Sequence, residues 1–287
     1  MKSMHRTLHR GVSSGEPLAS PFDTFASEKA LLRRGSVVLI AAPPGGMKTV
    51  LSMNIVLNVG CPTMYFSSDS DDFTMASRSL SMLTGEMTDE TELWVLGQKR
   101  EAYEKLKDMD HIRWSFRSSP TIEHMREECE AYSELNGEYP HLIVVDIMMD
   151  VDYDGVAEQN YWALMAEFKD MARDYEACVM VIHHTSESAK AGSPPPRSAI
   201  MGKANQLPAL ILTLWGDAAK KKLQVAVVKN RFGPQDPTAG RFFEMYADPA
   251  ICLIKDPEVK VDLAYRDGPY VPDAQKINKL SGVEFDG

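Results

Sequence analysis

Short segments made almost entirely of apolar residues alternate along this chain with segments of helical pattern, and this alternation limits the possible folds most. Strands are expected at residues 36–41, 63–67, 111–116, 142–146, 178–183 and 210–215. Helices are expected at 27–33, 48–59, 72–84, 119–136 and 156–175, with a broken, solvated pair at 88–109. Strands that are apolar at nearly every position are buried on both faces. The sequence therefore predicts an α/β protein whose mostly parallel sheet is covered by helices on both faces.

The composition divides the chain into three parts. Residues 1–21 are polar and basic with scattered Gly and Pro, which is typical of a flexible arm. The alternating segments occupy residues 22–255, which we expect to form one domain that closes with a β-hairpin at 223–231 and 241–246. Residues 256–287 are hydrophilic and predict a tail on the surface.

The charge balance argues against binding of nucleic acid by global attraction. The chain has 31 Lys and Arg against 41 Asp and Glu, a net charge of −10, so any nucleic-acid contact requires a local basic patch. No apolar run reaches the roughly 20 residues that cross a bilayer, and the polar start is no secretory signal. Four cysteines without Cys-x-x-Cys spacing indicate buried thiols. We therefore expect a cytoplasmic protein that does not bind membranes.

The loop after the first strand has the composition of a phosphate-binding loop. Residues 42–49 read Ala-Pro-Pro-Gly-Gly-Met-Lys-Thr between a strand and a helix, where backbone N–H groups and the helix N-terminus bind anions. Lys48 would reach the β- and γ-phosphates, and Thr49 would offer its hydroxyl to Mg²⁺. Met47 stands where the usual pattern has Gly, and a positive φ there costs about 1 kcal/mol or more. An ordinary glycine-rich turn is the alternative.

Two acidic residues follow neighbouring apolar strands. Asp146 ends the strand at 142–146 and would hold Mg²⁺ through water beside Thr49. Asp69 follows the strand at 63–67 and is a candidate base for polarising the attacking water. Asp71 and Asp72 fit solvated or helix-capping positions better. Both acid positions would lie at the carboxyl edge of the sheet, where ligands of such folds bind.

His183 and His184 end the strand at 178–183, so they point to opposite faces of the sheet and do not readily share a metal ion. His184 is a candidate sensor of the γ-phosphate, and a structural histidine is the alternative. Lys229 and Arg231 lie two residues apart, so both project from the same face of the hairpin. They could neutralise a transferring phosphoryl group, although the residues alone favour a solvated basic turn.

The order of these pieces resembles the RecA-like ATPase core of DnaB-type hexameric replicative helicases over roughly residues 22–254. The phosphate loop resembles the family's Ala-x-Pro-x-x-Gly-Lys-Thr, with Met47 as the departure. Phe66-Ser-Ser-Asp69 resembles Phe-Ser-Leu-Glu, with a carboxylate one methylene shorter than the catalytic glutamate. Lys229-Asn-Arg-Phe-Gly-Pro234 resembles the Lys-Gln-Arg-Asn-Gly-Pro hairpin, and His184 falls on the family's glutamine sensor.

This resemblance implies a RecA-like P-loop NTPase core that binds ATP and Mg²⁺ at subunit interfaces. Lys229 and Arg231 would then reach the ATP of a neighbouring copy, which reverses the interpretation from the residues alone. The resemblance also implies a hexamer that moves on single-stranded DNA and that could have a primase or helicase-loader partner. The nucleotide-binding residues that it implies are Pro44, Gly45, Gly46, Met47, Lys48, Thr49 and Val50.

The resemblance places DNA-contacting loops near the end of the core. The corresponding stretch here is 190–203, which contains Arg197, Gly202 and Lys203 as candidate DNA-binding residues. The Arg-Glu pair that often precedes the family's glycine is Ala199-Ile200 in this chain. A basic, proline-rich surface loop without a ligand is the alternative.

The sequence thus predicts an ATP-dependent DNA helicase or translocase of the minimal, phage-type form. A RecA-fold recombination or loading ATPase that does not unwind DNA is a second hypothesis, motivated by Met47 and by the missing primase-binding domain. A third is a metal-dependent nuclease, because acidic residues that two-metal cleavage needs follow one strand. These acidic residues are Asp146, Asp150, Asp152 and Asp154.

Overall fold

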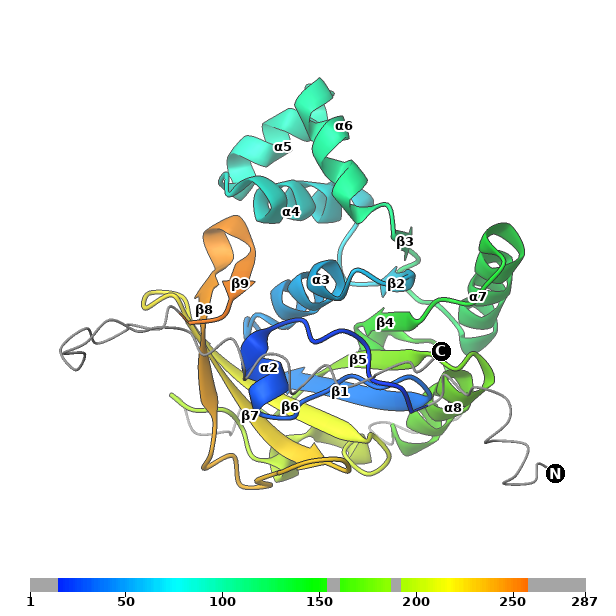
Figure 1. The fold of residues 1–287 in the computed structure, drawn as a ribbon, viewed down its shortest axis with the longest axis vertical. Helices are drawn as coiled ribbons and strands as arrows, with labels where there is room; N and C mark the ends of the chain where they lie inside the picture. The colour runs from blue at the N-terminus through cyan, green and yellow to red at the C-terminus, as the bar shows by residue number, and fades with distance from the viewer. Residues whose placement is uncertain (1–14, 154–160, 187–191, 258–287) are drawn as a thin grey trace, which may run out of the picture. The chain divides into compact units, whose positions relative to one another are not determined.

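In the residues that the structure describes, one sheet of nine strands organises the fold (Figure 1). The structure is a computed structural model and describes residues 15–153, 161–186 and 192–257. The strands are β1 (Ser36–Ala42), β2 (Thr63–Ser67), β3 (Ile112–Ser115), β4 (Leu142–Asp146), β5 (Cys178–His184), β6 (Leu210–Asp217), β7 (Lys222–Asn230), β8 (Phe243–Asp248) and β9 (Leu253–Lys255). The helices are α2 (Asp23–Ser27), α3 (Lys48–Val59), α4 (Asp72–Thr84), α5 (Thr88–Leu96), α6 (Arg100–Leu106), α7 (Ile122–Asn136) and α8 (Trp162–Asp174).

The strand order is β3-β2-β4-β5-β1-β6-β7-β8-β9. The six strands from β3 to β6 pair in parallel, whereas β6 to β9 pair antiparallel. The expected mostly parallel α/β sheet is confirmed, and so is the hairpin of β7 and β8. The strand β9, which the sequence did not predict, extends the antiparallel part by one further strand.

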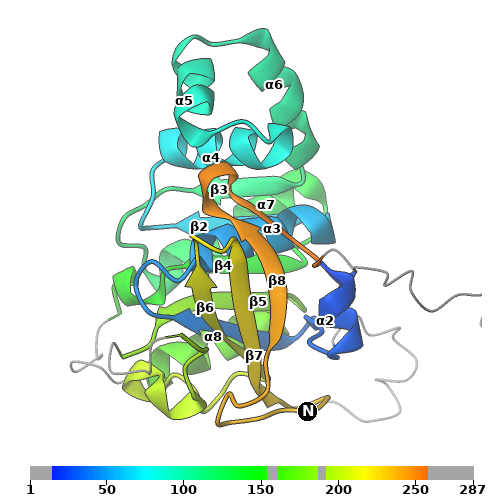
Figure 2. The same cartoon turned by 90° about the vertical axis from the view of Figure 1, so that its left-hand side faces the viewer.

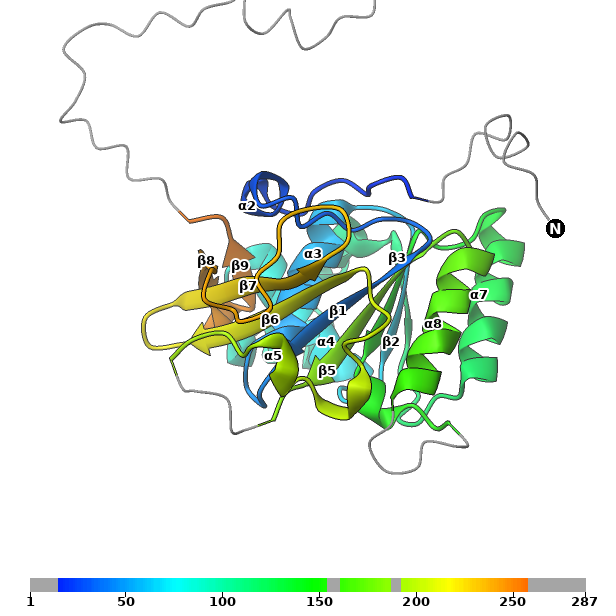
Figure 3. The same cartoon turned by 90° about the horizontal axis from the view of Figure 1, so that it is seen from below.

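The sheet is covered on both faces, as its apolar strands require. Val38 and Ile40 of β1 belong to the core cluster that α3 covers. Their neighbours Val37 and Leu39 point the other way, into the cluster that α7 and α8 cover. Figure 3 shows α7 and α8 next to each other along that second face. None of the helices in the described residues is long and apolar enough to cross a membrane.

The helices α4, α5 and α6 form a group beyond α3, away from the sheet (Figure 1). The helix α4 begins where the Asp71 carboxylate accepts the backbone N–H of Thr74 at 2.8 Å, and it ends at Gly85, whose φ is 78°. Capping by an aspartate and termination by a left-handed glycine are both expected from sequence. The broken pair expected at 88–109 corresponds to α5, α6 and a following 3-10 turn.

Three expectations at the chain's ends change. The helix expected at 27–33 is wrong, because α2 spans Asp23–Ser27 and Lys29 takes a left-handed φ of 56° that stops the helix. Residues 15–18, expected in a flexible arm, hydrogen-bond along residues 32–34. Asp256, expected in a surface tail, caps α2 by accepting the N–H groups of Asp23 and Thr24. Residues 1–14 and 258–287 lie outside the described part of the chain.

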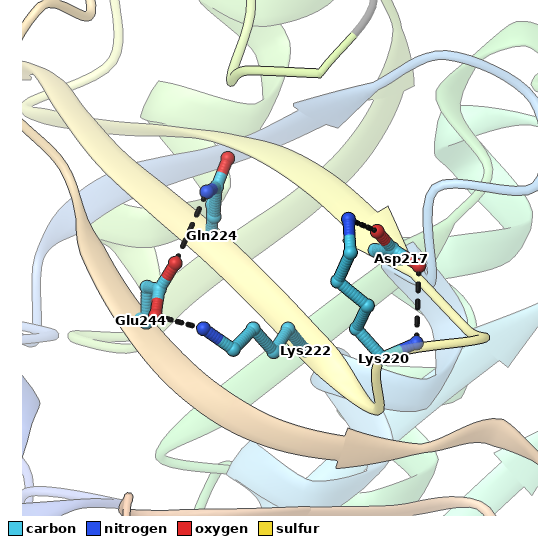
Figure 4. Close-up of polar contacts among 5 residues, drawn as sticks. All are labelled: Asp217, Lys220, Lys222, Gln224 and Glu244. Carbon is cyan, nitrogen blue, oxygen red and sulfur yellow. Dashed lines mark hydrogen bonds and ion pairs between the residues drawn. The ribbon is translucent and has the colours of Figure 1, made fainter.

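The β6–β7 turn is held by ion pairs (Figure 4). Asp217 accepts both the backbone N–H and the ammonium of Lys220, at 3.1 and 2.8 Å. On the neighbouring strands, Glu244 accepts Lys222 at 2.7 Å and Gln224 at 3.2 Å. Figure 2 shows this antiparallel part of the sheet face-on, with the turn between β8 and β9 rising to α4.

Candidate nucleotide-binding site

The loop between β1 and α3 folds back tightly on the end of its strand. A Cβ added at Gly46 would lie 2.6 Å from the Ala42 Cβ and 2.9 Å from the Pro43 carbonyl oxygen, so only glycine fits there. The Gly46 N–H donates to the same Pro43 carbonyl at 3.1 Å. The helix α3 then begins at Lys48, with its first free N–H groups next to the loop.

Met47 has the left-handed conformation that makes a non-glycine residue costly. Its φ is 60° and its ψ 26°, a region that costs L-residues about 1 to 2 kcal/mol. Its side chain lies against Gly216 of β6, where an added Cβ would come within 3.1 Å of the Met47 Cγ, Sδ and Cε atoms. Met47 replaces the usual glycine of the loop, and its side chain lies where Gly216 on a neighbouring strand has no side chain.

Lys48 is a buried cation, with a relative exposure of 8%. Its ammonium donates to the carbonyl oxygens of Ala42 at 3.2 Å and Pro43 at 2.9 Å. Burial lowers the pKa of Lys48 to about 8, although the carboxylates of Asp146 and Asp69 act in the opposite direction. An anion bound beside this ammonium would restore the solvation that burial removes.

Asp146 is a buried carboxylate next to the start of α3, with a relative exposure of 4%. The Tyr65 hydroxyl donates to its Oδ2 at 2.7 Å, and the Thr49 hydroxyl also hydrogen-bonds to it. The Ser52 hydroxyl lies 2.7 Å from the Tyr65 oxygen and extends this network. Burial raises the pKa of Asp146 above its ordinary value despite these two hydroxyl donors.

These groups line one cavity of about 720 Å³ at the carboxyl edge of the sheet. The sequence-predicted residues from Pro44 to Val50 line it, together with Asp69, Asp146 and His184. Asp69 is exposed, and its charge acts on Lys48, Asp146 and His184. The strand order explains this convergence, because β2, β4, β5 and β1 are neighbours and end at the same edge.

The residues fit a nucleotide with a divalent cation. A buried ammonium and the N-terminus of a twelve-residue helix suit phosphate oxygens. Mg²⁺ prefers oxygen ligands and keeps several waters, and the Thr49 hydroxyl and the Asp146 carboxylate lie together at that helix start. Thr49 and Asp146 would therefore hold Mg²⁺, as the sequence predicts.

The two histidines face different surroundings, as the period of a strand requires. His184 faces the cavity, and its Nδ1 lies 3.2 Å from the Lys48 Nζ. His183 is fully buried on the other face, with its Nε2 3.2 Å from the Met201 carbonyl oxygen and its ring against Tyr161. Burial lowers the pKa of His183 to about 4. His183 is thus a structural group, and His184 alone of the pair belongs to the cavity.

Lys229 and Arg231 lie away from the phosphate loop, level with the middle and the first half of β1. Lys229 pairs with Ile211, which pairs with Leu39 of β1, and the Arg231 N–H donates to Ala209 just before β6. The loop begins only after Ala42. Along β1, Lys229 is therefore about three residues from Ala42 and Arg231 about five, at about 3.3 Å per residue. In the described part of the chain, neither cation lines the 720 Å³ cavity.

Both cations contact one neighbouring segment. The Lys229 ammonium donates to the Gln206 carbonyl at 2.7 Å, and the Arg231 guanidinium to the Leu207 carbonyl at 3.3 Å. Burial and the charges of Arg231 and Arg197 lower the pKa of Lys229 to about 8. Asn230, between the two cations, is buried and donates to the Lys29 carbonyl at 2.9 Å. Lys229 and Arg231 therefore share a face, as predicted, on a fixed turn.

The candidate DNA-binding residues lie in two 3-10 turns, Arg197–Ala199 and Met201–Lys203. Gly202 and Lys203 both have a positive φ, of 65° and 61°, and the Gly202 carbonyl accepts the N–H of Tyr161. Arg197 lines a second cavity with Asn205 and is close enough to act on Lys229. Residues 187–191, which include the first part of this predicted loop, lie outside the described residues.

The acidic run that suggested a nuclease does not converge among the residues that the structure covers. Asp146 and Asp150 line the phosphate-loop cavity, whereas the Asp152 N–H donates to the Pro120 carbonyl beside α7. The described residues contain no group of three acidic, His or Cys side chains placed to hold a metal ion. Asp154 lies outside them.

Sequence reasoning missed several residues of the cavity. The sequence predicts Tyr65 only as part of an apolar strand. A phenol in such a strand needs a buried partner, and here the partner is Asp146. Arg78 of α4 lines the cavity and donates to the Ser70 hydroxyl at 3.2 Å. Glu92 of α5 and Cys252 before β9 complete the far wall. No local pattern marks these last three residues, because they come from elements that approach the loop only in the folded chain.

A parallel sheet with a phosphate loop after its first strand, a buried lysine in that loop and a buried aspartate two strands away define a P-loop ATPase of RecA-like fold. The AAA domain family matches residues 28–190, and the chain belongs to it. The chain is 33% identical to the Gene 65 protein of Mycobacterium phage L5 over 84% of its length and 94% of the relative. It is 32% identical to the Gene 65 protein of Mycobacterium phage D29 over 72% of its length and 93% of the relative.

Solved structures agree on the fold. A solved ATPase domain superposes with a TM-score of 0.73 at 14% identity, covering 88% of this chain and 96% of that one. A DnaB-like replicative helicase, studied with its interactions with primase, gives 0.72 at 15% identity over 90% of this chain and 68% of that one. The RadB recombinase gives 0.54 at 14% identity over 84% and 100%. The predicted resemblance to DnaB-like ATPase cores is confirmed at the level of the fold.

Proposed function

We propose that this protein is an ATP-driven motor on single-stranded DNA of the DnaB-like helicase type. It hydrolyses ATP at the interfaces of a homo-oligomer, a hexameric ring by the resemblance. The observation that carries this proposal is the separation of Lys229 and Arg231 from the phosphate loop of their own chain. Two neighbouring cations that lie away from the phosphate loop of their own chain support a role at the site of a neighbouring copy.

Each cavity residue has a chemical part in this proposal. Lys48 binds the β- and γ-phosphates, and the backbone from Pro44 to Val50 surrounds them. Thr49 and Asp146 would hold Mg²⁺, which would supply charge neutralisation at the phosphate oxygens. Asp69 orients the attacking water and accepts its proton, and His184 senses the γ-phosphate.

The cations of the neighbouring copy complete the site. Lys229 and Arg231 stabilise the charge that develops on the transferring phosphoryl group. The buried Asn230 and its bond to the Lys29 carbonyl keep the two cations in place. A site divided between two copies predicts that ATP hydrolysis depends on assembly.

The test is a mixing experiment with two inactive variants. Lys48→Ala and Arg231→Ala should each keep at most about one-hundredth of the wild-type ATPase rate, within the range seen for such groups. In a random mixture, about one interface in four joins an intact loop to an intact Arg231. The mixture should therefore regain ATPase activity that neither variant has.

Arg241→Ala is the matched control, because Arg241 lies in the same connection between β7 and β8 but pairs with Glu28 on the surface. It should keep the wild-type rate. Full activity in Arg231→Ala alone, or no recovery in a mixture whose subunits exchange, would show that the cation does not act between copies.

The contact with DNA is proposed at Arg197, Gly202 and Lys203. Single-stranded DNA should stimulate ATP hydrolysis, and the Arg197→Ala, Lys203→Ala double variant should reduce that stimulation at least tenfold while basal hydrolysis persists. A steep loss of DNA affinity with added salt is expected from contacts to phosphates. A primase or helicase loader is the expected protein partner, and the host cytoplasm is the expected place of action for a protein with phage relatives.

A recombination or loading ATPase is the second candidate, since the fold also superposes on the RadB recombinase. Strand displacement on a forked DNA substrate separates the two. ATP hydrolysis stimulated by DNA without displacement would favour this second candidate, whereas displacement that requires Lys48 would favour the helicase.

A further inference from the structure

Met47 keeps a backbone conformation that glycine would adopt at no cost. A left-handed non-glycine residue persists only where its surroundings hold it. The residue is also the N-cap of α3, and its carbonyl accepts the Leu51 N–H at 2.9 Å, which is the first bond of that helix. The conformation of Met47 therefore sets both the direction of α3 and the start of the Lys48 side chain.

The group that holds Met47 is Gly216. An added Cβ at Gly216 would lie 3.1 Å from three Met47 side-chain atoms, Cγ, Sδ and Cε. The Met47 side chain thus lies over the backbone of β6, where a Cβ at 216 would press on it more closely than ordinary van der Waals contact allows. Gly216 itself is fixed, because its backbone pairs with Leu223 of β7 and the adjoining turn is held by Asp217 and Lys220 (Figure 4).

We propose that Met47 is a positioning residue, whose side chain, packed on Gly216, holds the phosphate loop in its nucleotide-binding conformation. This inference rests on the proposed nucleotide site. With glycine at 47 the loop would gain backbone freedom, and it would have to lose that freedom when a nucleotide binds. The Met47–Gly216 contact already restricts the backbone of the loop before a nucleotide arrives. Binding therefore does not have to order the loop.

A double-mutant cycle tests the contact, because it isolates the interaction of two residues from their separate effects. The variants are Gly216→Ala, Met47→Gly and the two combined. The measurements are the affinity for Mg-ADP and the amide hydrogen exchange of residues 45–49 without nucleotide. Gly216→Ala and Met47→Gly should each weaken the affinity about fivefold and speed exchange in the loop. Adding Gly216→Ala to Met47→Gly should change neither quantity more than about twofold, since the clash is gone.

Lys222→Ala is the matched control, since it removes an ion pair of the same hairpin without touching Met47. It should leave affinity and loop exchange at wild-type values. An unchanged loop in Gly216→Ala, or an equal loss in both backgrounds, overturns the proposal. If Gly216→Ala fails to fold, recovery of folding in the double variant supports the contact and failure of both overturns it.

The two proposals fail in different ways. Wild-type protein without affinity for Mg-ADP or Mg-ATP would refute the nucleotide site. The amide hydrogen exchange of residues 45–49 would still show whether Met47 and Gly216 act together on the loop. Nucleotide binding with additive effects of the two substitutions would leave the site intact and refute the role of Met47.

Discussion

The Lys48 Nζ lies 3.2 Å from the His184 Nδ1 at the carboxyl edge of the sheet. A protonated Lys48 donates to this nitrogen, so the imidazole is neutral and carries its proton on Nε2. Burial and the Lys48 charge both lower the pKa of His184, which keeps the ring neutral at physiological pH. In the proposed function, a neutral donor beside Lys48 would sense a γ-phosphate without adding a second charge.

Lys48→Met should remove nucleotide binding and stabilise the nucleotide-free protein. The fold lowers the pKa of Lys48 to about 8 from 10.5, so it disfavours the charged form. The stabilisation, about 1 kcal/mol or more, is fully present below pH 8 and disappears as pH rises through 10.5, where the unfolded lysine also loses its proton. Thermal unfolding should show a Tm higher by about 2–4 °C at pH 7.

The control is Lys107→Met, at an exposed surface pair, which should leave Tm unchanged. A Tm that falls in Lys48→Met would contradict the prediction.

His183→Gln should flatten the acid dependence of stability. Burial lowers the pKa of His183 to about 4 from 6.5, so the unfolded state binds its proton first. Stability contributed by the neutral ring is therefore lost as pH falls from 6.5 to 4. Glutamine can still donate to the Met201 carbonyl. Urea unfolding at pH 7 and pH 5 should show a smaller difference in the variant than in the wild type, and an equal difference would refute the assignment.

Tyr65→Phe should raise the Mg²⁺ concentration needed for ATP hydrolysis by about tenfold, the lower end of the usual effect of a residue that supports a metal ligand. The hydroxyl orients the Asp146 carboxylate at 2.7 Å and stabilises its charge. Titration of the ATPase rate with Mg²⁺ measures this shift. Tyr139→Phe removes a surface bond to Glu130 instead and should have no effect. An unchanged Mg²⁺ requirement in Tyr65→Phe would show that Asp146 does not serve the metal.

Asp69→Asn should lower the ATP turnover at least about a hundredfold while Mg-ATP binding persists, because an amide cannot accept the proton of the attacking water. Asp69→Glu should retain turnover, since the family resemblance places a longer carboxylate there. Single-turnover hydrolysis and nucleotide binding, measured on the same samples, separate the two steps. Undiminished hydrolysis in Asp69→Asn would exclude Asp69 as the base.

The elements near the phosphate loop could be predicted because their signals are local. The apolar strand Ser36–Ala42, the loop glycines and Gly60 at the end of α3 each follow from a few adjacent residues. The prediction of a helix at 27–33 was wrong, because the residue pattern does not predict the left-handed backbone of Lys29, beyond which α2 does not continue. Tyr65 could not be recognised from the sequence, because its part in the site depends on a hydrogen bond to Asp146, a carboxylate on another strand.

The sequence by itself determined the α/β class, the phosphate loop and the acids that end two strands, since hydrophobic periodicity and turn chemistry act over short stretches of chain. Only the tertiary structure decided that β2, β4, β5 and β1 lie side by side, so that Asp69, Asp146, His184 and Lys48 meet at one cavity. It also decided that Gly216 receives Met47 and that Lys229 and Arg231 lie away from the phosphate loop. Strand neighbours are chosen by packing among distant segments, and no local pattern carries that information.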